Sequence, residues 1–312
     1  MFLNRFDYKI DFMGKRYVTM AISALLVIVA VSSIVMQGLV FGIDFTGGTL
    51  VEVGYKQDAN LEKIRSALHN NGFPNAVVQN FGTTKEVLIR LGVHKETKEN
   101  PLSTQILRLL KADGTEVDMR RVEFVGPQVG GELIEQGGLA VLYTLFGVLI
   151  YVAFRFEYRF ALGSIAALVH DTLIVVGVFS VFRLEFDLTV LAAILAVIGY
   201  SLNDTIVVFD RIRENFIKMR KQDSISVMNI SINQMLGRTV MTSVTTILVL
   251  VVLFVVGGEL IHGFSTALLI GVIVGTYSSI YIASATALAL GISKSDLMPV
   301  KKEGSEQEDT TY

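Results

Sequence analysis

The stretch 188–210 constrains the fold most, because it is long and apolar enough to cross a lipid bilayer as a helix yet carries a carboxylate at Asp204. A membrane-spanning helix needs about 20 mostly apolar residues. An Asp near the centre of such a helix costs roughly 2.5 to 3.5 kcal/mol on insertion scales, so Asp204 must face protein or water. The stretch predicts a membrane helix with a functional carboxylate. The alternative is a buried carboxylate that only locks helices together.

The composition places this stretch in a membrane protein. Of 312 residues, 52% are hydrophobic and 18% are charged, and the mean hydropathy is +0.55. These values are too apolar for an ordinary soluble domain. The sequence has no Cys, which excludes disulfides and thiol chemistry, and its His residues are too far apart for a zinc site. No basic patch suggests nucleic acid, and we expect neither a metal nor a cofactor.

Six apolar runs are long enough to span a bilayer. The first is longer than the core of a signal peptide, which has about 7 to 15 apolar residues, so we expect an uncleaved membrane helix. The predicted helices cover residues 17–40, 134–154, 161–182, 188–210, 239–256 and 264–290. The predicted fold class is therefore a polytopic α-helical membrane protein, with helices 2 to 6 forming a bundle over 134–290.

Lys and Arg gather in the segments that would lie on one side of the membrane. Those segments are the N-terminal residues 1–16, the loop after the second predicted helix, the loop 211–238 and the tail 291–312. The two remaining loops between helices of the bundle are short and poor in positive charge. Because positively charged loops stay in the cytoplasm, we expect both termini to be cytoplasmic.

Residues 42–133 differ from the rest because they are mixed in polarity and contain short periodic segments. Alternating residues predict strands, and apolar residues three and four apart predict helices. The predicted strands are 49–55, 76–81, 86–91 and 117–125, with helices near 61–68 and from 101 onward. The order βαββαβ is that of a ferredoxin-like α+β domain. We expect this domain to be inserted after the first membrane helix, on the side opposite the termini.

Polar groups inside the predicted helices give a candidate site. Ser201 and Asp204 share a helix face that extends toward the cytoplasmic end, and Asn203 adjoins them. Arg238 begins the fifth predicted helix, and Thr242 follows on the same side. A carboxylate that can change charge and a cation that biases it are what a proton relay requires. We predict a proton pathway here; alternatively, Arg238 is a cytoplasmic anchor and Thr242 a hydrogen-bonding group between helices.

Two further features lie in the third and sixth predicted helices. Asp171 is a second candidate for the proton pathway. Its neighbour His170 cannot face the same cavity squarely, since adjacent helical residues point about 100° apart, so one of the two is expected against a partner helix. In the sixth helix, small residues recur every four positions at Gly271, Gly275 and Ser279. This spacing is typical of close helix packing.

Seven short motifs occur in order along the chain. They are GIDFTGG at 42–48, FVGP at 124–127, FRFE at 154–157, ALVHD at 167–171, VIGYSLNDTIVV at 197–208, DRIREN at 210–215 and RTVMTS at 238–243. Together with the six predicted helices, they resemble the SecF family of protein-export membrane subunits, which belongs to the resistance-nodulation-division superfamily. The resemblance runs from about residue 12 to residue 290.

The resemblance implies a function and partners. SecF proteins pair with SecD, which has the same six-helix plan, and the pair associates with the SecYEG channel and often YajC in the bacterial plasma (inner) membrane. The resemblance implies that residues 42–133 are periplasmic. It also implies that the pair uses the proton-motive force to draw unfolded secretory polypeptides outward after the SecA motor has pushed them in. On this pattern, Asp204 and Arg238 match the family's proton-pathway residues.

The sequence leaves two alternative functions open. One is a non-transporting scaffold that stabilises SecD and the channel. The other is a proton-driven exporter of small solutes, against which the six helices and the single inserted domain argue. A hydrolytic enzyme is not expected, because the chain has no nucleophile and base pair and no P-loop motif.

Overall fold

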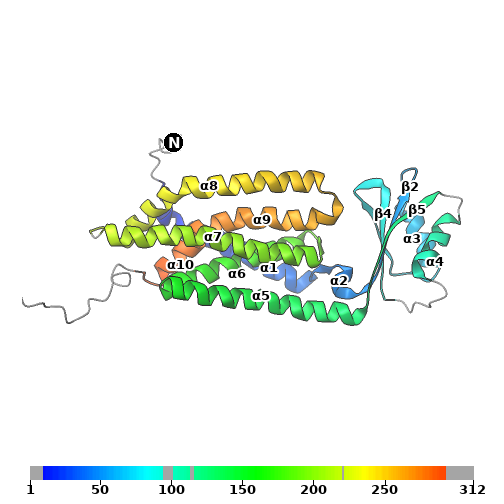
Figure 1. Cartoon of the computed structure of the whole chain (residues 1–312), viewed down its shortest axis with the longest axis horizontal. Helices are drawn as coiled ribbons and strands as arrows, with labels where there is room; N and C mark the ends of the chain where they lie inside the picture. The colour runs from blue at the N-terminus through cyan, green and yellow to red at the C-terminus, as the bar shows by residue number, and fades with distance from the viewer. Residues whose placement is uncertain (1–9, 94–100, 113–115, 220, 293–312) are drawn as a thin grey trace, which may run out of the picture.

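The computed structural model describes residues 10–93, 101–112, 116–219 and 221–292. It is elongated, with a bundle of long helices and a small α+β domain at one end (Figure 1). We call that end of the bundle the domain end, and the opposite end, near Lys218 and Ser224, the far end. The outermost parts of the predicted terminal segments, 1–9 and 293–312, lie outside the described residues.

Six helices in the described part of the chain are long and apolar enough to cross a membrane, which confirms the predicted fold class. The first follows a short 3-10 turn, Met13–Lys15, and the sixth is divided by a π-helical turn, Ser279–Ala283. The helices are α1 (Arg16–Gln37), α5 (Pro127–Arg155), α6 (Tyr158–Val181), α7 (Leu188–Lys218), α8 (Ser224–Val256), and α9 (His262–Ser278) continued by α10 (Ser284–Ala289).

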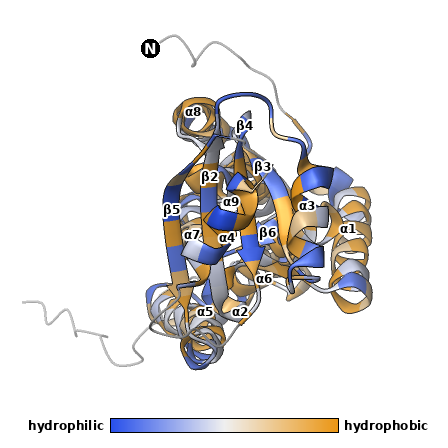
Figure 2. Ribbon diagram, turned by 90° about the vertical axis from the view of Figure 1, so that its right-hand side faces the viewer, coloured by the Kyte–Doolittle hydropathy of each residue, from blue (hydrophilic) through white to orange (hydrophobic). Residues whose placement is uncertain are grey.

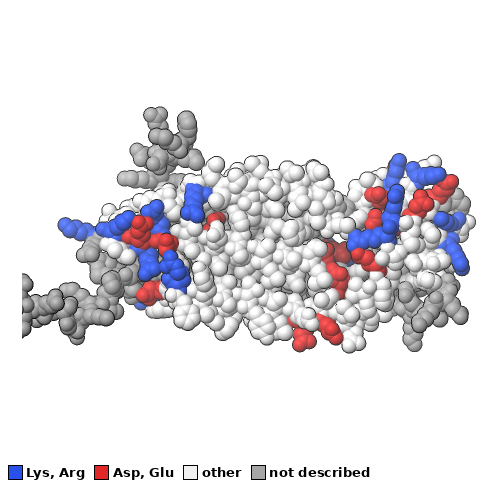
Figure 3. Space-filling view, in the orientation of Figure 1, with Lys and Arg blue, Asp and Glu red and all other residues white. Residues whose placement is uncertain are grey.

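The helices form a centre and a periphery. α6, α7 and α9 are the more buried, and α1, α5 and α8 lie around them with apolar residues turned outward (Figure 2). Phe146 of α5 and Leu248 and Val252 of α8 are among these exposed apolar side chains. On the face in Figure 3, charged side chains gather at the two ends and leave an almost uncharged band between them. This pattern suits a bundle whose middle lies in hydrocarbon.

Two predicted boundaries were wrong. α5 begins at Pro127 rather than at 134. Pro suits the first position of a helix because its fixed φ is helical and because the N–H that it lacks would have no partner within the helix. The predicted loop 211–238 is mostly helical, since α7 runs to Lys218 and α8 starts at Ser224. The charged residues there fit a helix because Glu214 pairs with both Arg211 and Lys218 along the same face.

The α+β domain has the predicted ferredoxin-like topology. Its sheet has the antiparallel order β3-β4-β2-β5, and two helices cover one face, where Val51, Leu68 and Ile106 meet in the core. Gly82, with φ of 71°, makes the turn between β3 and β4, so β4 begins at Thr83 rather than at the predicted residue 86. The elements are β2 (Gly48–Tyr55), α3 (Leu61–Asn70), β3 (Val77–Phe81), β4 (Thr83–Leu91), α4 (Leu102–Lys111) and β5 (Val117–Val125).

The motif at 42–48 connects the domain to the bundle. It contains the single-turn helix α2 (Ile43–Thr46), and Gly47 and Gly48 follow with φ of 69° and 130°. These positive φ values favour glycine. A Cβ at Gly47 would lie 2.9 Å from Cα of Pro127, so a larger residue would also separate this turn from the start of α5. The motif therefore brings the domain directly onto the end of the bundle.

Candidate functional site in the helix bundle

Asp204 lies on α7 and is almost fully buried, with 4% of its surface exposed. Among the described residues, its Oδ2 atom has no hydrogen-bond partner, and neither do the buried hydroxyls of Tyr200 and Thr205 on α7 and Thr239 on α8. Such unpaired buried polar atoms are uncommon in proteins and require an explanation. Tyr200 and Thr205 lie within about one helical turn of Asp204 along α7, and unpaired polar groups beside a carboxylate in a membrane helix point to a functional site.

Arg238 lies beside this site on α8. Its guanidinium acts electrostatically on Asp204, although within the described part of the chain the two make no ion pair within 4.0 Å. Arg238 and Asn203 are both exposed on the surface of the bundle. Thr242 is half-buried, and its hydroxyl donates to the carbonyl oxygen of Thr239 at 2.9 Å. α7 and α8 thus bring the predicted carboxylate and cation into one region, with the cation at the surface.

Asp171 has very different surroundings. It is 1% exposed, and its Oδ2 accepts hydrogen bonds from the hydroxyls of Ser201 on α7 at 2.6 Å and Ser278 on α9 at 2.7 Å. Its Oδ1 lies 2.9 Å from Nδ1 of His170, which is also buried. The two adjacent side chains on α6 therefore contact each other, and both are buried, whereas we expected that they would not face the same cavity and that one would lie against a partner helix. One carboxylate joins α6, α7 and α9.

The close approach of α9 to α7 makes this cluster possible. A Cβ added at Gly271 would overlap the side chain of Val197, and one at Gly275 would lie 3.0 Å from Cβ of Ser201. Ser279 begins the π-helical turn, and its hydroxyl donates to the carbonyl oxygen of a residue on its own helix. The small residues at 271 and 275 let the two helices touch. Hydroxyls of both helices can then reach the same carboxylate oxygen.

Sequence reasoning missed Ser278 and gave His170 little weight. Ser278 lies next to Ser279 but outside the four-residue repeat of small residues, so the repeat did not indicate it. The hydroxyls of Ser243 on α8 and Thr276 on α9, 2.6 Å apart, were also missed. The only signal was the unusual number of hydroxyl residues in otherwise apolar helices. Which of them meet depends on helix rotation, which hydropathy does not report.

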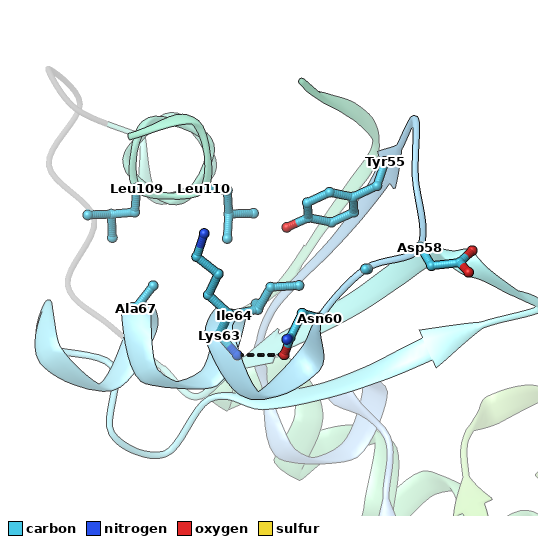
Figure 4. A pocket seen from close by; sticks show the side chains of 9 residues that line it. Tyr55, Asp58, Asn60, Lys63, Ile64, Ala67, Leu109 and Leu110 are labelled. Atoms are coloured by element: carbon cyan, nitrogen blue, oxygen red, sulfur yellow. Dashed lines mark hydrogen bonds between the residues drawn. The ribbon is translucent and has the colours of Figure 1, made fainter. Parts of the chain in front are cut away.

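The α+β domain contains a small hollow of about 180 Å³ between α3, α4 and the end of β2 (Figure 4). Apolar side chains such as Ile64 and Leu110 line it, and the Lys63 amine and the Tyr55 phenol point into it. Burial raises the pKa of Tyr55 to about 12, so its phenol stays neutral at physiological pH. The lining residues include no nucleophile and base pair. Over all described residues, no group of three or more acidic, His or Cys side chains could hold a metal.

The structure combines six membrane helices, a ferredoxin-like domain inserted after the first helix, and polar groups buried in the helix bundle. These features place the chain among polytopic membrane proteins that carry a folded domain outside the membrane. Two family models narrow this class. Residues 32–59 match the SecD/SecF GG motif, and residues 105–293 match the C-terminal model of protein export membrane proteins SecD/SecF. The chain belongs to the SecD/SecF family.

Relatives and solved structures agree with this family. The chain is 54% identical over 301 residues to protein translocase subunit SecF of Vibrio alginolyticus, covering 95% of each chain. It is 50% identical over 291 residues to the SecF subunit of Pseudomonas aeruginosa, covering 93% of this chain and 94% of that one. The crystal structure of SecDF from Thermus thermophilus, a translocon-associated membrane protein, matches 93% of this chain with a TM-score of 0.84 and 39% identity. This chain spans only 39% of that longer SecDF chain.

Proposed function

We propose that this chain is a SecF subunit of the accessory complex of the Sec translocase. It works with SecD and uses the proton-motive force to promote late steps in the translocation of secreted proteins, rather than acting as a hydrolytic enzyme. The observation that carries this proposal is the state of Asp204, a buried carboxylate with an unpaired oxygen beside an arginine. Such a group can take up and release a proton at modest structural cost, because no hydrogen bond to Oδ2 must break.

The mechanism follows from the charge change. Proton uptake neutralises Asp204 and removes its attraction to Arg238, which alters how α7 and α8 attract each other. Movement of one charge across the membrane supplies about 2.3 kcal/mol per 100 mV, which is comparable to the cost of a rearrangement between helices. Ser201, Asn203 and Thr242 line the proposed path around this carboxylate. Asp171 belongs to the same polar layer, where its hydrogen bonds hold it in place between three helices.

SecD is the proposed partner for the polar surface of the bundle. Asn203 on α7 and Arg238 and Thr245 on α8 are exposed on this chain, although they lie on helices long and apolar enough to span a membrane. Polar and charged groups at that depth are costly in contact with lipid. A second chain covering this face would remove that cost. The longer SecDF chain, of which this chain matches only part, supports such a partner.

The proposed orientation has both termini and residues 219–223 in the cytoplasm of a bacterium, with the chain crossing the inner membrane six times. The positive charges of the N-terminal segment and of the far end support it, because such charges favour the cytoplasmic side. The α+β domain is then periplasmic, where it would meet unfolded secretory polypeptides. We propose the SecYEG channel and YajC as further partners from the family alone.

The test is export of a secretory precursor into inverted membrane vesicles in which this chain is the only SecF subunit. Wild type, Asp204→Asn and Arg238→Met are compared with and without a proton gradient. We expect the gradient to accelerate late translocation only in wild type. If both variants match wild type at full gradient while deletion of the chain still impairs export, the chain is a scaffold for SecD and the channel.

A further inference from the structure

The α+β domain is fastened to the bundle by two short strands and one arginine. β1 (Val40–Phe41), which follows α1, pairs in parallel with β6 (Glu185–Phe186), which precedes α7. Arg90 of β4 forms an ion pair with Glu185, and its Nη1 donates a hydrogen bond to the carbonyl oxygen of Phe41 at 3.3 Å. One side chain of the domain therefore holds both strands. We call this set of contacts the junction.

Arginine suits this position for a physical reason. The Arg90 side chain is only 16% exposed, so its charge needs a partner close by. Its planar guanidinium has several donors in a fixed fork, which lets it bond a carboxylate and a carbonyl oxygen together. The two acceptors come from segments more than a hundred residues apart in the sequence. Arg90 thus joins the domain to the segment after α1 and to the segment before α7.

The start of α7 is also held by the connecting motif. Oδ2 of Asp44 accepts a hydrogen bond from the backbone N–H of Leu188 at 3.0 Å, and Oδ1 of Asp187 accepts one from Val190 at 2.8 Å. A helix leaves its first N–H groups unsatisfied, and its dipole favours negative charge at that end. Asp44 lies in the motif that connects α1 to the domain. The first turn of α7 is therefore hydrogen-bonded to the motif that leads into the α+β domain.

α7 carries this attachment to the proposed proton site. Asp204 lies about 24 Å from Leu188 along the helix, at 1.5 Å per residue. We infer that Arg90 and Glu185 are positioning residues that make the α+β domain and the domain end of α7 move together when the charge of Asp204 changes. The inference rests on the proposed function and extends it, because it names the contact through which a proton event in the membrane reaches the domain outside it.

Opposing effects act on the Glu185 carboxylate at the junction. Burial raises the pKa of Glu185, the Arg90 guanidinium opposes this rise, and the carboxylates of Asp187 and Asp44 add to it. The ion pair therefore forms against desolvation and repulsion between like charges, so its net contribution is smaller than the direct attraction. A contact of this kind can loosen and re-form without unfolding of either side. An ion pair that can open and re-form suits a junction between the α+β domain and α7 if α7 moves.

The first experiment measures the distance between the domain and the bundle. The chain has no Cys, so spin labels can be placed at Lys85→Cys in β4 and Leu260→Cys between α8 and α9, both exposed positions. Pulsed electron resonance on the full chain in membranes gives the distance distribution between them. We expect Arg90→Gln and Glu185→Gln to broaden it. The exchanged pair Arg90→Glu with Glu185→Arg should narrow it again.

The matched control is Arg121→Gln. Arg121 lies in the same sheet and pairs with Glu123 on its own strand, and its side chain is also partly buried. This variant loses an ion pair inside the domain without touching the bundle, so its distribution should stay as narrow as that of wild type. If Arg90→Gln leaves the width unchanged, or if Arg121→Gln broadens it equally, the inference is overturned.

The second experiment is the vesicle export assay. We expect Arg90→Gln to lose most of the gradient-dependent increment and to keep gradient-independent export, whereas the exchanged pair recovers part of the increment. A full increment in Arg90→Gln despite a broadened distribution overturns the positioning role. If Asp204→Asn keeps the increment, the proposed function fails separately, and the junction is then judged by the distance distributions alone.

Discussion

Asp171 and Asp204 are two buried carboxylates in the same bundle, and their surroundings are opposite. Asp171 is bonded by Ser201, Ser278 and His170, whereas Oδ2 of Asp204 has no partner among the described residues. Ser201 lies one helical turn before Asp204 on α7. The two sites are therefore neighbours that differ in how completely their hydrogen-bonding capacity is used.

We expect this difference to separate a carboxylate that mainly joins helices from the carboxylate that takes up a proton in the proposed function. The hydroxyls of Ser201 and Ser278 donate to Asp171, and Nδ1 of His170 lies within hydrogen-bond distance, so these contacts hold the carboxyl group in one position. Movement of the Asp171 side chain would disturb contacts among three helices. Protonation of Asp204 breaks no hydrogen bond to Oδ2 and changes mainly its interaction with Arg238. Asp171 can therefore hold α7 in place while the charge of Asp204 changes as proposed.

The largest expected effect is that of Asp204→Asn on export. The amide cannot change charge, so the gradient-dependent increment in late translocation should disappear, while the free energy of unfolding in detergent stays at or above that of wild type. Asp210→Asn is the control, because Asp210 lies on the same helix but is exposed and pairs with Arg155 at 3.1 Å. A loss of increment in both variants would remove the special status of Asp204.

Asp171→Ala should show the reverse pattern. It leaves the hydroxyls of Ser201 and Ser278 and the imidazole of His170 without their acceptor, which should lower the free energy of unfolding by about 3 kcal/mol or more. Denaturant titration in detergent micelles measures this, with Asp210→Ala expected to cost at most about 1 kcal/mol as an exposed ion pair. Equal stabilities for Asp171→Ala and Asp204→Ala would show that the two carboxylates do not differ.

Gly271→Ala tests whether helix contact maintains the Asp171 cluster. The added methyl group would overlap Val197, and the resulting overpacking should cost about 1 to 3 kcal/mol of unfolding free energy. Gly138→Ala on α5 is the control, since its added Cβ has no atom within 4 Å apart from its own residue, its chain neighbours and the nearby backbone of its own helix. The control should equal or exceed wild type in stability, because Ala favours a helix more than Gly does. If Gly271→Ala leaves the free energy of unfolding unchanged, α7 and α9 can move apart without a loss of stability.

The smallest expected effect is that of Ser243→Ala. It removes the hydroxyl that lies 2.6 Å from the Thr276 hydroxyl and joins α8 to α9. Hydrogen bonds between membrane helices contribute about 0.6 kcal/mol on average, so the change in unfolding free energy should be near that value. The same measurement on Ser278→Ala should give a larger loss, because its partner is a carboxylate. Equal losses would indicate that the hydrogen bond from Ser278 to Asp171 is no stronger than the one between the two hydroxyls.

Much of the architecture followed from local pattern. The six helices and the ferredoxin-like order were predictable, because hydropathy over 20 residues and alternation over 6 residues depend only on neighbours in the chain. The boundaries at Pro127 and at 211–238 were missed, since a helix end depends on capping and side-chain pairing that hydropathy does not report. Asp204 was found because a carboxylate in an apolar run is visible without any structure.

The sequence by itself determined that this chain crosses a membrane, that it carries an α+β domain and that Asp204 requires an explanation. Only the tertiary structure decided that Asp171 is saturated, that Ser278 belongs to its cluster and that Arg90 bonds Glu185. Ser278 and Asp171 are 107 residues apart, and Arg90 and Glu185 lie on different parts of the fold. Such contacts depend on how helices rotate and how a domain docks, which many distant residues set together.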